Sequence, residues 1–312
     1  MFATVIAGSA KPDSRANHEA AVSKRESGCP NQALWLLLFP VPALLVGALT
    51  MQQSGLNASV WSQNSATWLL MCILCLLFIQ SVALLQRRGV AAGVLAFSVA
   101  VIGGTFFFAG LHGVHRWVSL GPFLLQPAAI VIPLFLICTG SSPRSVVWIF
   151  AFTTVTLLAL QPDPASATAL LAGMVVRRAF GKERVSAFEW TATALLLALV
   201  VFSWSRKDPL PQVQHVEGIL ALARSINPAL ARGGLISLLV LPLPFVICAR
   251  APSCEKATSA SLAAYFVVLE LVCITGRFPV PIMGYGASLV IGYVLALAWL
   301  ANELRARRRM AR

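Results

Sequence analysis

The chain has 312 residues, of which 58% are hydrophobic and 11% are charged. Soluble globular domains carry about 25% charged residues, so this composition excludes a water-soluble domain and a disordered chain. The 24 Lys and Arg residues outnumber the 11 Asp and Glu residues, which leaves a formal net charge of +13. In a membrane protein such an excess sets topology and contacts anionic membrane lipids, so we expect no nucleic-acid partner.

Apolar runs long enough to cross a membrane recur along the chain. A spanning helix needs about 20 mostly apolar residues, and backbone groups in hydrocarbon must be hydrogen-bonded within their own segment, which favours helices. We predict an all-α polytopic membrane protein with its transmembrane domain at 33–304. We count about ten spans, or eight or nine if the two short runs 145–160 and 164–179 do not cross the membrane. The predicted spans are residues 33–51, 67–86, 89–109, 123–140, 145–160, 164–179, 187–205, 232–249, 257–275 and 282–303.

Two features interrupt the regular spans. Proline pairs predict kinks in the first, fourth and eighth spans, and they are Pro40 and Pro42, Pro127 and Pro133, and Pro242 and Pro244. The longest connection, 206–231, begins with an Asp208-Pro209 turn signal. It then carries apolar residues at helical spacing, which predicts an interfacial or re-entrant helix.

Both ends of the chain are predicted to lie in the cytoplasm. Residues 1–32 are polar and lack an early apolar core with a cleavage site, so we expect a disordered tail and no cleaved signal peptide. Residues 305–312 predict a short basic tail. In this orientation 18 of the 24 Lys and Arg residues fall on cytoplasmic segments, which is the expected bias. The other six are Arg116, Arg206, Lys207, Arg224, Arg232 and Arg277.

The predicted outer loops concentrate the few polar groups of the chain. They hold Asp163, Asp208, Glu217, His112, His115 and His215, beside the cations Arg116, Arg206, Lys207 and Arg277. In a chain so poor in charge, mixed charge and imidazole on one face predict a polar site that opens outward.

Metal or redox motifs are weak. His112 and His115 have a spacing that would place both on one helical face, but no nearby carboxylate or cysteine completes a ligand set. Cys72 and Cys75 have CxxC spacing inside an apolar run, and we interpret them as packing residues. Glu270 lies within a span, so we expect it to face the bundle interior with a partner.

Four segments resemble motifs of the SEDS family, the RodA, FtsW and SpoVE type of bacterial cell-wall synthesis proteins. The stretch HGVHRWVSLGPFLLQP at 112–127 is similar to the family's Gly-x-x-Arg-Trp-x-x-Leu-Gly-Pro-x-x-x-Gln-Pro signature. Three further segments follow in the family's order, namely Gln161-Pro162-Asp163, Asp208-Pro209-Leu210 with Gln214-His215-Val216, and Thr275-Gly276 with PIMGYGAS at 281–288. The matches extend from about 105 to 295, and the family's ten-helix bundle agrees with the predicted spans.

The sequence departs from the family pattern at several positions. Ala128 and Ala129 stand where the family has Ser-Glu with a lysine close by. The outer loop has Glu217-Gly218 and later 223–225 in place of the family's Gln-Ser and Ser-Gly-Gly, and Gly284 replaces a serine. The chain is also short for the family, so the resemblance implies a divergent, short member.

The resemblance implies a peptidoglycan glycosyltransferase. Such an enzyme polymerises lipid II, a disaccharide-pentapeptide on undecaprenyl pyrophosphate, at the outer face of the bacterial inner membrane, with a class B penicillin-binding protein as partner. Asp208 matches the family's essential aspartate and would act as general base on the attacking sugar hydroxyl. Arg116 is the first candidate to bind the leaving pyrophosphate, and Arg206, Lys207 and Arg277 are weaker candidates. A divalent cation, Mg or Mn, is a further candidate to stabilise the charge that develops on the pyrophosphate.

Trp117, Asp163 and His215 complete the predicted substrate-binding set. Asp163 would hold a cation or pair with an arginine. Trp117 is also expected to anchor its loop at the membrane interface.

Structural roles are open for most of these residues. Asp208 could be a helix cap or turn residue before proline, and Arg116 could pair with Asp163 and stabilise the loops. Glu217 and His215 could be solvated loop residues. Gly284 and Gly286 suit close helix packing.

Two other classes of protein also remain open. One is a catalytically inactive SEDS-like scaffold for a penicillin-binding protein. The other is a transporter or flippase for a polyprenyl-linked sugar, which should show charge at membrane mid-depth and internal repeats. Glu270 is the candidate for such a charge, and the sequence shows no convincing repeat.

Overall fold

The computed structural model describes residues 35–78, 81–121, 123–181, 185–251 and 255–310. The predicted tail 1–32 lies outside the described residues, as do Lys182, Arg184 and Arg312. The described α-helices and strands are α3 Val41–Gln53, α4 Ala58–Phe78, α5 Arg88–Gly104, β1 Val118–Leu120, β2 Phe123–Leu125, α6 Pro127–Cys138, α7 Arg144–Leu160, α8 Pro164–Phe180, α9 Ala187–Ser205, α10 Ile219–Ile226, α11 Pro228–Val240, α12 Leu243–Arg250, α13 Lys256–Cys273 and α14 Ala287–Met310, with 3-10 turns η1 Ser81–Gln86 and η2 Thr105–Phe107.

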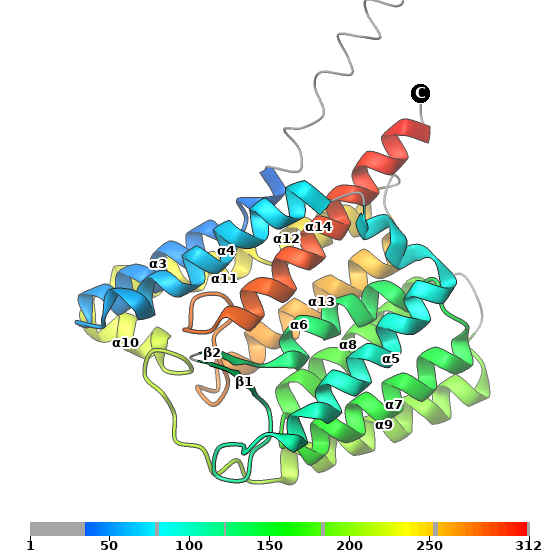
Figure 1. The fold of residues 1–312 in the computed structure, drawn as a ribbon, viewed down its shortest axis with the longest axis horizontal. Helices are drawn as coiled ribbons and strands as arrows, with labels where there is room; N and C mark the ends of the chain where they lie inside the picture. The colour runs from blue at the N-terminus through cyan, green and yellow to red at the C-terminus, as the bar shows by residue number, and fades with distance from the viewer. Residues whose placement is uncertain (1–34, 79–80, 122, 182–184, 252–254, 311–312) are drawn as a thin grey trace, which may run out of the picture.

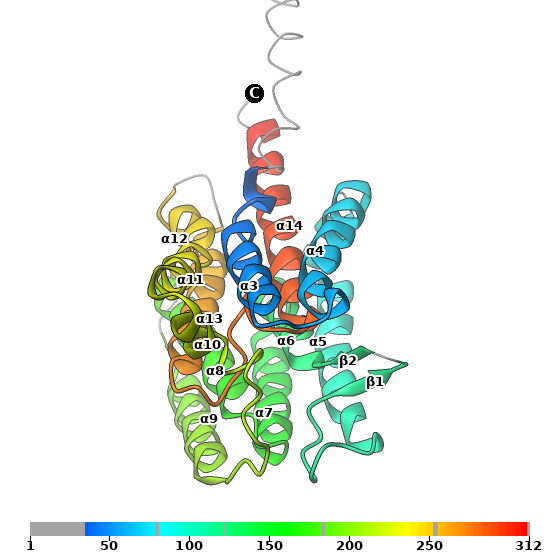
Figure 2. The same cartoon turned by 90° about the vertical axis from the view of Figure 1, so that its left-hand side faces the viewer.

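The helices form one bundle (Figure 1). α13 packs along α8, while α14 lies against both α4 and α6. The α3–α4 pair lies along one flank, where α3 also contacts α10 and α11 (Figure 2). The described chain begins and ends at the same end of the bundle in both views. An even number of spans would produce this arrangement.

The all-α polytopic membrane fold is confirmed. Within the described residues, seven helical stretches are long and apolar enough to cross a membrane, and they are Trp35–Gln53, Ala58–Phe78, Arg88–Phe107, Ala187–Ser205, Pro228–Arg250, Lys256–Cys273 and Ala287–Ala306. The other three predicted spans coincide with the shorter helices α6, α7 and α8. The count of ten stays a prediction.

The second predicted span, 67–86, is misplaced. α4 begins nine residues earlier, at Ala58, and ends at Phe78, and η1 occupies the end of the predicted run. The first turns of α4 are polar, so an apolar window misses them. The polar Asn64 can be buried on this helix because its side chain donates to the carbonyl oxygens of Ile282 at 2.9 Å and Gly284 at 2.7 Å.

Asn64 also accepts a hydrogen bond from the Gly286 backbone N–H at 3.1 Å. It therefore binds three backbone groups of the turn 280–286. That turn holds Ile282 at a φ of 65°, which is costly for a β-branched residue and persists only where surrounding contacts enforce it. Asn64 supplies such contacts.

The proline predictions have mixed outcomes. Pro242 separates α11 from α12, and the Tyr293 hydroxyl donates to the Leu241 carbonyl oxygen at 2.7 Å beside this break. Pro133 lies inside α6, whereas Pro127 is its first residue and bends nothing. Pro40 directly precedes α3.

The sequence did not reveal the hairpin β1–β2. Phe123–Leu125 pairs antiparallel with Val118–Leu120, so the span predicted at 123 begins instead at Pro127. The backbone N–H of Gln126 donates to Ser288 Oγ at 2.8 Å, which ties the end of the hairpin to α14. α6 has 12 residues and a length of about 18 Å, less than the hydrocarbon thickness of about 30 Å.

The helix predicted in the connection 206–231 is present as α10. Ile219 and Ala223 are buried on one face of it. Asn227 then caps α11, because its side-chain oxygen accepts from the Ala229 N–H at 2.8 Å. At the other end of the chain, α14 continues to Met310, so the predicted basic tail starts as part of this helix.

Candidate functional site

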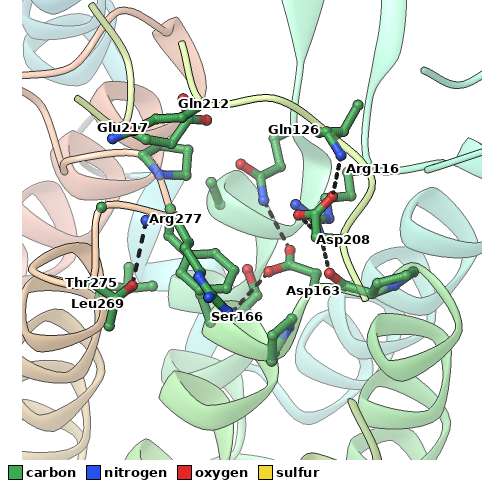
Figure 3. Close-up of a pocket in the computed structure, with 18 of the residues that line it drawn as sticks. Arg116, Gln126, Asp163, Ser166, Asp208, Gln212, Glu217, Leu269, Thr275 and Arg277 are labelled. Atoms are coloured by element: carbon green, nitrogen blue, oxygen red, sulfur yellow. Dashed lines mark hydrogen bonds and ion pairs between the residues drawn. The ribbon is translucent and has the colours of Figure 1, made fainter. Parts of the chain in front are cut away.

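A polar cavity of about 740 Å³ lies between the loops and helix ends on one side of the bundle. Residues from 116–129, 162–166, 204–217 and 275–281 line it, together with side chains of α13 and α14 (Figure 3). Seven of the eight predicted site residues are among them, and they are Arg116, Trp117, Asp163, Arg206, Lys207, Asp208 and Arg277.

Arg116 is the most highly connected cation of the cavity. Its side chain is 6% exposed, and its Nη2 lies 2.7 Å from Asp208 Oδ2. The guanidinium also donates to the carbonyl oxygens of Gln161, at 3.1 Å from Nε, and of Pro162. Its Cζ lies 5.9 Å from the centre of the Trp117 ring, within cation–π distance. The position of this charge is thus fixed on several sides.

A second set of hydrogen bonds holds the segment that carries Arg116. The buried Gln161 amide donates to the Ile102 carbonyl oxygen at 2.7 Å and to Thr105 Oγ1 at 2.6 Å. Thr105 Oγ1 lies 2.6 Å from the carbonyl oxygen of His115. Gln161 therefore supports Arg116 twice, through its own carbonyl group and through Thr105.

Asp208 combines an ion pair with a turn. Its Oδ1 accepts the Leu210 backbone N–H at 3.1 Å, which is the turn geometry expected before Pro209. Its Oδ2 pairs with Arg116, and 27% of the side chain stays exposed. The structural alternative in which Arg116 pairs with Asp163 is wrong, because Asp208 takes that place.

Asp163 is the most buried carboxylate that lines the cavity and is only 2% exposed. It caps α8 by accepting the Ser166 backbone N–H at 3.1 Å, and its other oxygen accepts the Gln126 side-chain amide at 2.9 Å. Figure 3 shows Gln126 and Ser166 converging on it. Asp163 thus contributes a buried, hydrogen-bonded carboxyl group to the cavity lining.

Arg277 lines the cavity from the turn that follows α13. Gly276, at a φ of 70°, directs the chain out of the helix, and the Arg277 N–H lies 3.4 Å from Thr275 Oγ1. Arg206 and Lys207 follow the end of α9 and precede Asp208. Cations therefore line the cavity from three separate segments.

His215 is the predicted site residue that the structure leaves out. Its ring packs edge-on against Tyr285 at 5.7 Å, and its carbonyl oxygen accepts the Tyr285 N–H at 2.9 Å. Histidine at this position thus joins two loops and does not line the cavity. His112 has a φ of 50° and lies in no helix, so it shares no helical face with His115.

Glu217 was open to interpretation as a solvated loop residue, yet it lines the cavity. Its Oε2 accepts the Val213 N–H at 2.9 Å. Sequence reasoning also missed Gln126, Trp204 and Tyr265 as lining residues. Gln126 could have been found from its place in the Gln-Pro motif, whereas Trp204 and Tyr265 lie inside apolar runs that give no such signal.

The glycines of the last motif serve backbone geometry. A Cβ at Gly284 would lie 2.5 Å from the carbonyl oxygen of Val216, so a serine does not fit here. Gly286 has a φ of 145° and open space around it, so its conformation and not helix packing requires glycine. Helix packing does involve Gly292, where a Cβ would lie 2.0 Å from the Ala129 carbonyl oxygen.

Together these features define a polytopic helical membrane protein with a charged cavity on one side. No family model matches the chain, and no curated protein matches it in sequence. Its fold is similar to the solved structure of Thermus thermophilus rod shape determining protein RodA, with a TM-score of 0.61 and 18% identity over 87% of this chain and 96% of that chain.

A mutant of the same RodA gives a TM-score of 0.62 at 17% identity, over 87% of this chain and 97% of that chain. A chain of a peptidoglycan synthase complex, solved to describe coordination of polymerization and crosslinking, gives 0.59 at 19% identity, over 88% and 98%. The chain therefore has the SEDS-like fold that its motifs predicted, in a divergent sequence. The match covers nearly all of each neighbour, so these solved chains do not bear out the expectation of a short member.

Proposed function

We propose that this chain is a SEDS-type peptidoglycan glycosyltransferase that polymerises lipid II at the outer face of the bacterial inner membrane. The observation that carries the proposal is the Arg116–Asp208 ion pair at 2.7 Å on the wall of a polar cavity. The two residues belong to two different motifs of the family resemblance, and the fold brings them together.

Asp208 is the proposed general base. A sugar hydroxyl that attacks an anomeric carbon must lose its proton, and a carboxylate within hydrogen-bond reach can accept it. A new C–O bond then forms at the anomeric carbon as its bond to the pyrophosphate oxygen breaks. The Leu210 N–H and Arg116 orient the carboxylate, and its exposed fraction leaves room for the hydroxyl.

The cations of the cavity are proposed to stabilise the leaving pyrophosphate. Negative charge grows on it as the bond breaks, and positioned positive groups stabilise that charge most in a site with restricted water. Arg116, Arg206, Lys207 and Arg277 line the same cavity. Trp117 holds the Arg116 guanidinium beside it and is proposed to contact the substrate as well.

The donors of the cavity do not form a built site for Mg or Mn. Within the described residues, no three His, Cys, Asp or Glu side chains lie close enough to share an ion. Both Asp163 oxygens already accept hydrogen bonds, and Asp208 is paired with Arg116. We therefore assign no step to a metal.

The proposal includes the predicted topology and partner. We place both termini in the cytoplasm, so that the cavity would face outward, where lipid II would present its sugars. A class B penicillin-binding protein is the proposed partner, since one solved chain of this fold comes from a peptidoglycan synthase complex.

One observation favours the scaffold alternative. Ala129 lines the cavity where the family carries a glutamate, so this position supplies no carboxyl group to the cavity. A flippase has less support. Glu270 is the candidate for a charge at membrane mid-depth, because it is buried and its Oε1 has no hydrogen-bond partner among the described residues. However, the charged residues of the cavity come from loops and helix ends on one side of the bundle, whereas a flippase is expected to carry charge at mid-depth.

Polymerisation of lipid II by purified protein, alone and with its partner, tests the proposal. Wild type should form glycan strands, and Asp208→Ala should reduce the rate by about 10²–10⁴-fold. Equal product from both proteins would remove Asp208 as the base. No product from wild type with its partner present would favour the scaffold.

A further inference from the structure

The mechanism above makes no use of an aromatic pair on the cavity wall. Trp204 lies one residue before the end of α9, and its ring is 5.5 Å from that of Phe278 in an edge-on arrangement. Both residues line the cavity. Phe278 is buried, whereas 41% of Trp204 is exposed. One apolar ring therefore stands open among charged and polar neighbours.

The orientation of the Trp204 ring is fixed. Its indole N–H donates to Thr168 Oγ1 at 3.0 Å, and Thr168 in turn donates to the Pro164 carbonyl oxygen at 2.6 Å. Phe278 supports the ring from the side. The ring is thus held by α8 and by the turn after α13, so little entropy would be lost when a ligand packs on it.

A tryptophan at the end of a membrane helix is often an interface anchor, with its N–H directed to water or lipid headgroups. Trp204 differs, because its N–H is bonded inside the protein. Trp190, at the other end of α9, is 65% exposed and lies outside the cavity lining. It provides the comparison of an exposed tryptophan on the same helix.

We propose that the exposed face of Trp204, backed by Phe278, is a platform that binds one hexopyranose ring of the glycan strand. Pyranose rings have an apolar C–H face and a rim of hydroxyl groups, so they pair with a flat ring that has polar groups around it. Gln212 also lines the cavity, and its Nε2 lies close to Gly276, two residues before Phe278. Ser205 and Arg206 follow Trp204 directly in the chain and line the same cavity.

This platform rests on the proposed function, and it adds a saccharide subsite beside the reacting centre. Trp204 precedes Asp208 by four residues along the connection that leaves α9. Both residues line one cavity, so a sugar ring stacked on Trp204 would lie in the cavity that holds the proposed base. The ligand class is a β-linked N-acetylhexosamine oligosaccharide, and its lipid is not needed for the contact.

The test measures binding of a soluble probe, the β-1,4-linked N-acetylglucosamine tetramer, to the full chain in detergent by titration calorimetry. Trp204→Leu should weaken binding by about tenfold, which corresponds to about 1.4 kcal/mol. Trp204→Phe should retain most of the affinity because it keeps an aromatic face. Trp190→Leu should bind as wild type does, since it removes an exposed tryptophan of the same helix outside the cavity.

Several results would overturn the platform. These are absence of saturable binding by wild type, unchanged binding by Trp204→Leu, and equal loss in Trp190→Leu. Thermal unfolding of each variant separates lost binding from lost folding. If Trp204→Leu is unfolded, the comparison with Trp190→Leu is made with Thr168→Val instead, which removes the acceptor of the Trp204 N–H and should also weaken binding. Glycan binding that depends on Trp204 in a protein that polymerises no lipid II would refute the proposed function and leave the platform standing.

Discussion

Arg116→Lys separates the geometry of the Arg116 guanidinium from its charge. In the structure the guanidinium binds three acceptors, which are the carbonyl oxygens of Gln161 and Pro162 and the carboxylate of Asp208. A lysine ammonium carries the same charge on one nitrogen. It can keep the ion pair with Asp208, but it lacks the planar fork that reaches the two backbone carbonyls.

The magnitude follows from the two bonds that are lost. Hydrogen bonds to a charged group contribute about 1.5–3 kcal/mol each. Because Pro162 lines the cavity, water can replace part of this. We therefore expect the free energy of unfolding to fall by about 2–3 kcal/mol. Misplacement of reacting groups by about 1 Å costs about 10²-fold in rate, so polymerisation should fall by about that factor.

Two assays check this prediction, thermal unfolding of the purified protein and gel analysis of lipid II polymerisation with the partner protein present. Arg232→Lys is the matched control, because Arg232 is exposed, lies outside the cavity lining and makes one long bond to its own helix at 3.4 Å. If Arg116→Lys leaves the unfolding midpoint unchanged and polymerises lipid II within about twofold of the wild-type rate, the hydrogen bonds of the planar guanidinium have no such role.

Three further predictions concern the scaffold and the topology. Asn64→Leu leaves three backbone groups of the turn 280–286 without hydrogen-bond partners. Each such bond contributes about 0.6 kcal/mol or somewhat more in a membrane protein, so the free energy of unfolding should fall by about 2 kcal/mol. Ser62→Ala is the control, because it loses a bond within its own helix and should change the free energy of unfolding little. Gly292→Ala places a Cβ 2.0 Å from a carbonyl oxygen of α6. The free energy of unfolding, followed by thermal unfolding, should fall by about 1–3 kcal/mol. No change would mean that α14 can shift to make room for the methyl group. The Ser225→Cys variant should react with an impermeant maleimide on intact cells, and the Arg87→Cys variant only after permeabilisation. The reverse pattern would show that the topology is inverted.

Hydropathy located most spans because exclusion from water is a property of the local run of residues. α9 matches its predicted bounds, and α7 and α8 differ by one residue at an end. The same method failed for α4. Asn64 is polar in sequence but is stabilised by carbonyl groups more than 200 positions away, and no local window contains such a partner.

The hairpin β1–β2 illustrates a second limit. Its residues are apolar and continue into α6, so they read as one membrane span. The hairpin forms because Gly121 adopts a φ of 61° and because Gln126 is tied to Ser288 on a distant helix. The glycine is visible in the local sequence, whereas the bond to Ser288 depends on how distant helices pack.

What the sequence by itself determined is the class of protein and seven of the residues that line the cavity. The low fraction of charge requires a membrane environment, and four motifs in order select the side chains that meet in the cavity. The partners of those side chains were decided by the tertiary structure. Arg116 pairs with Asp208 and not Asp163, His215 joins two loops, and Trp204 faces the cavity. Each outcome depends on how turns bring separate segments to within about 3–6 Å, the range of hydrogen bonds and ring contacts.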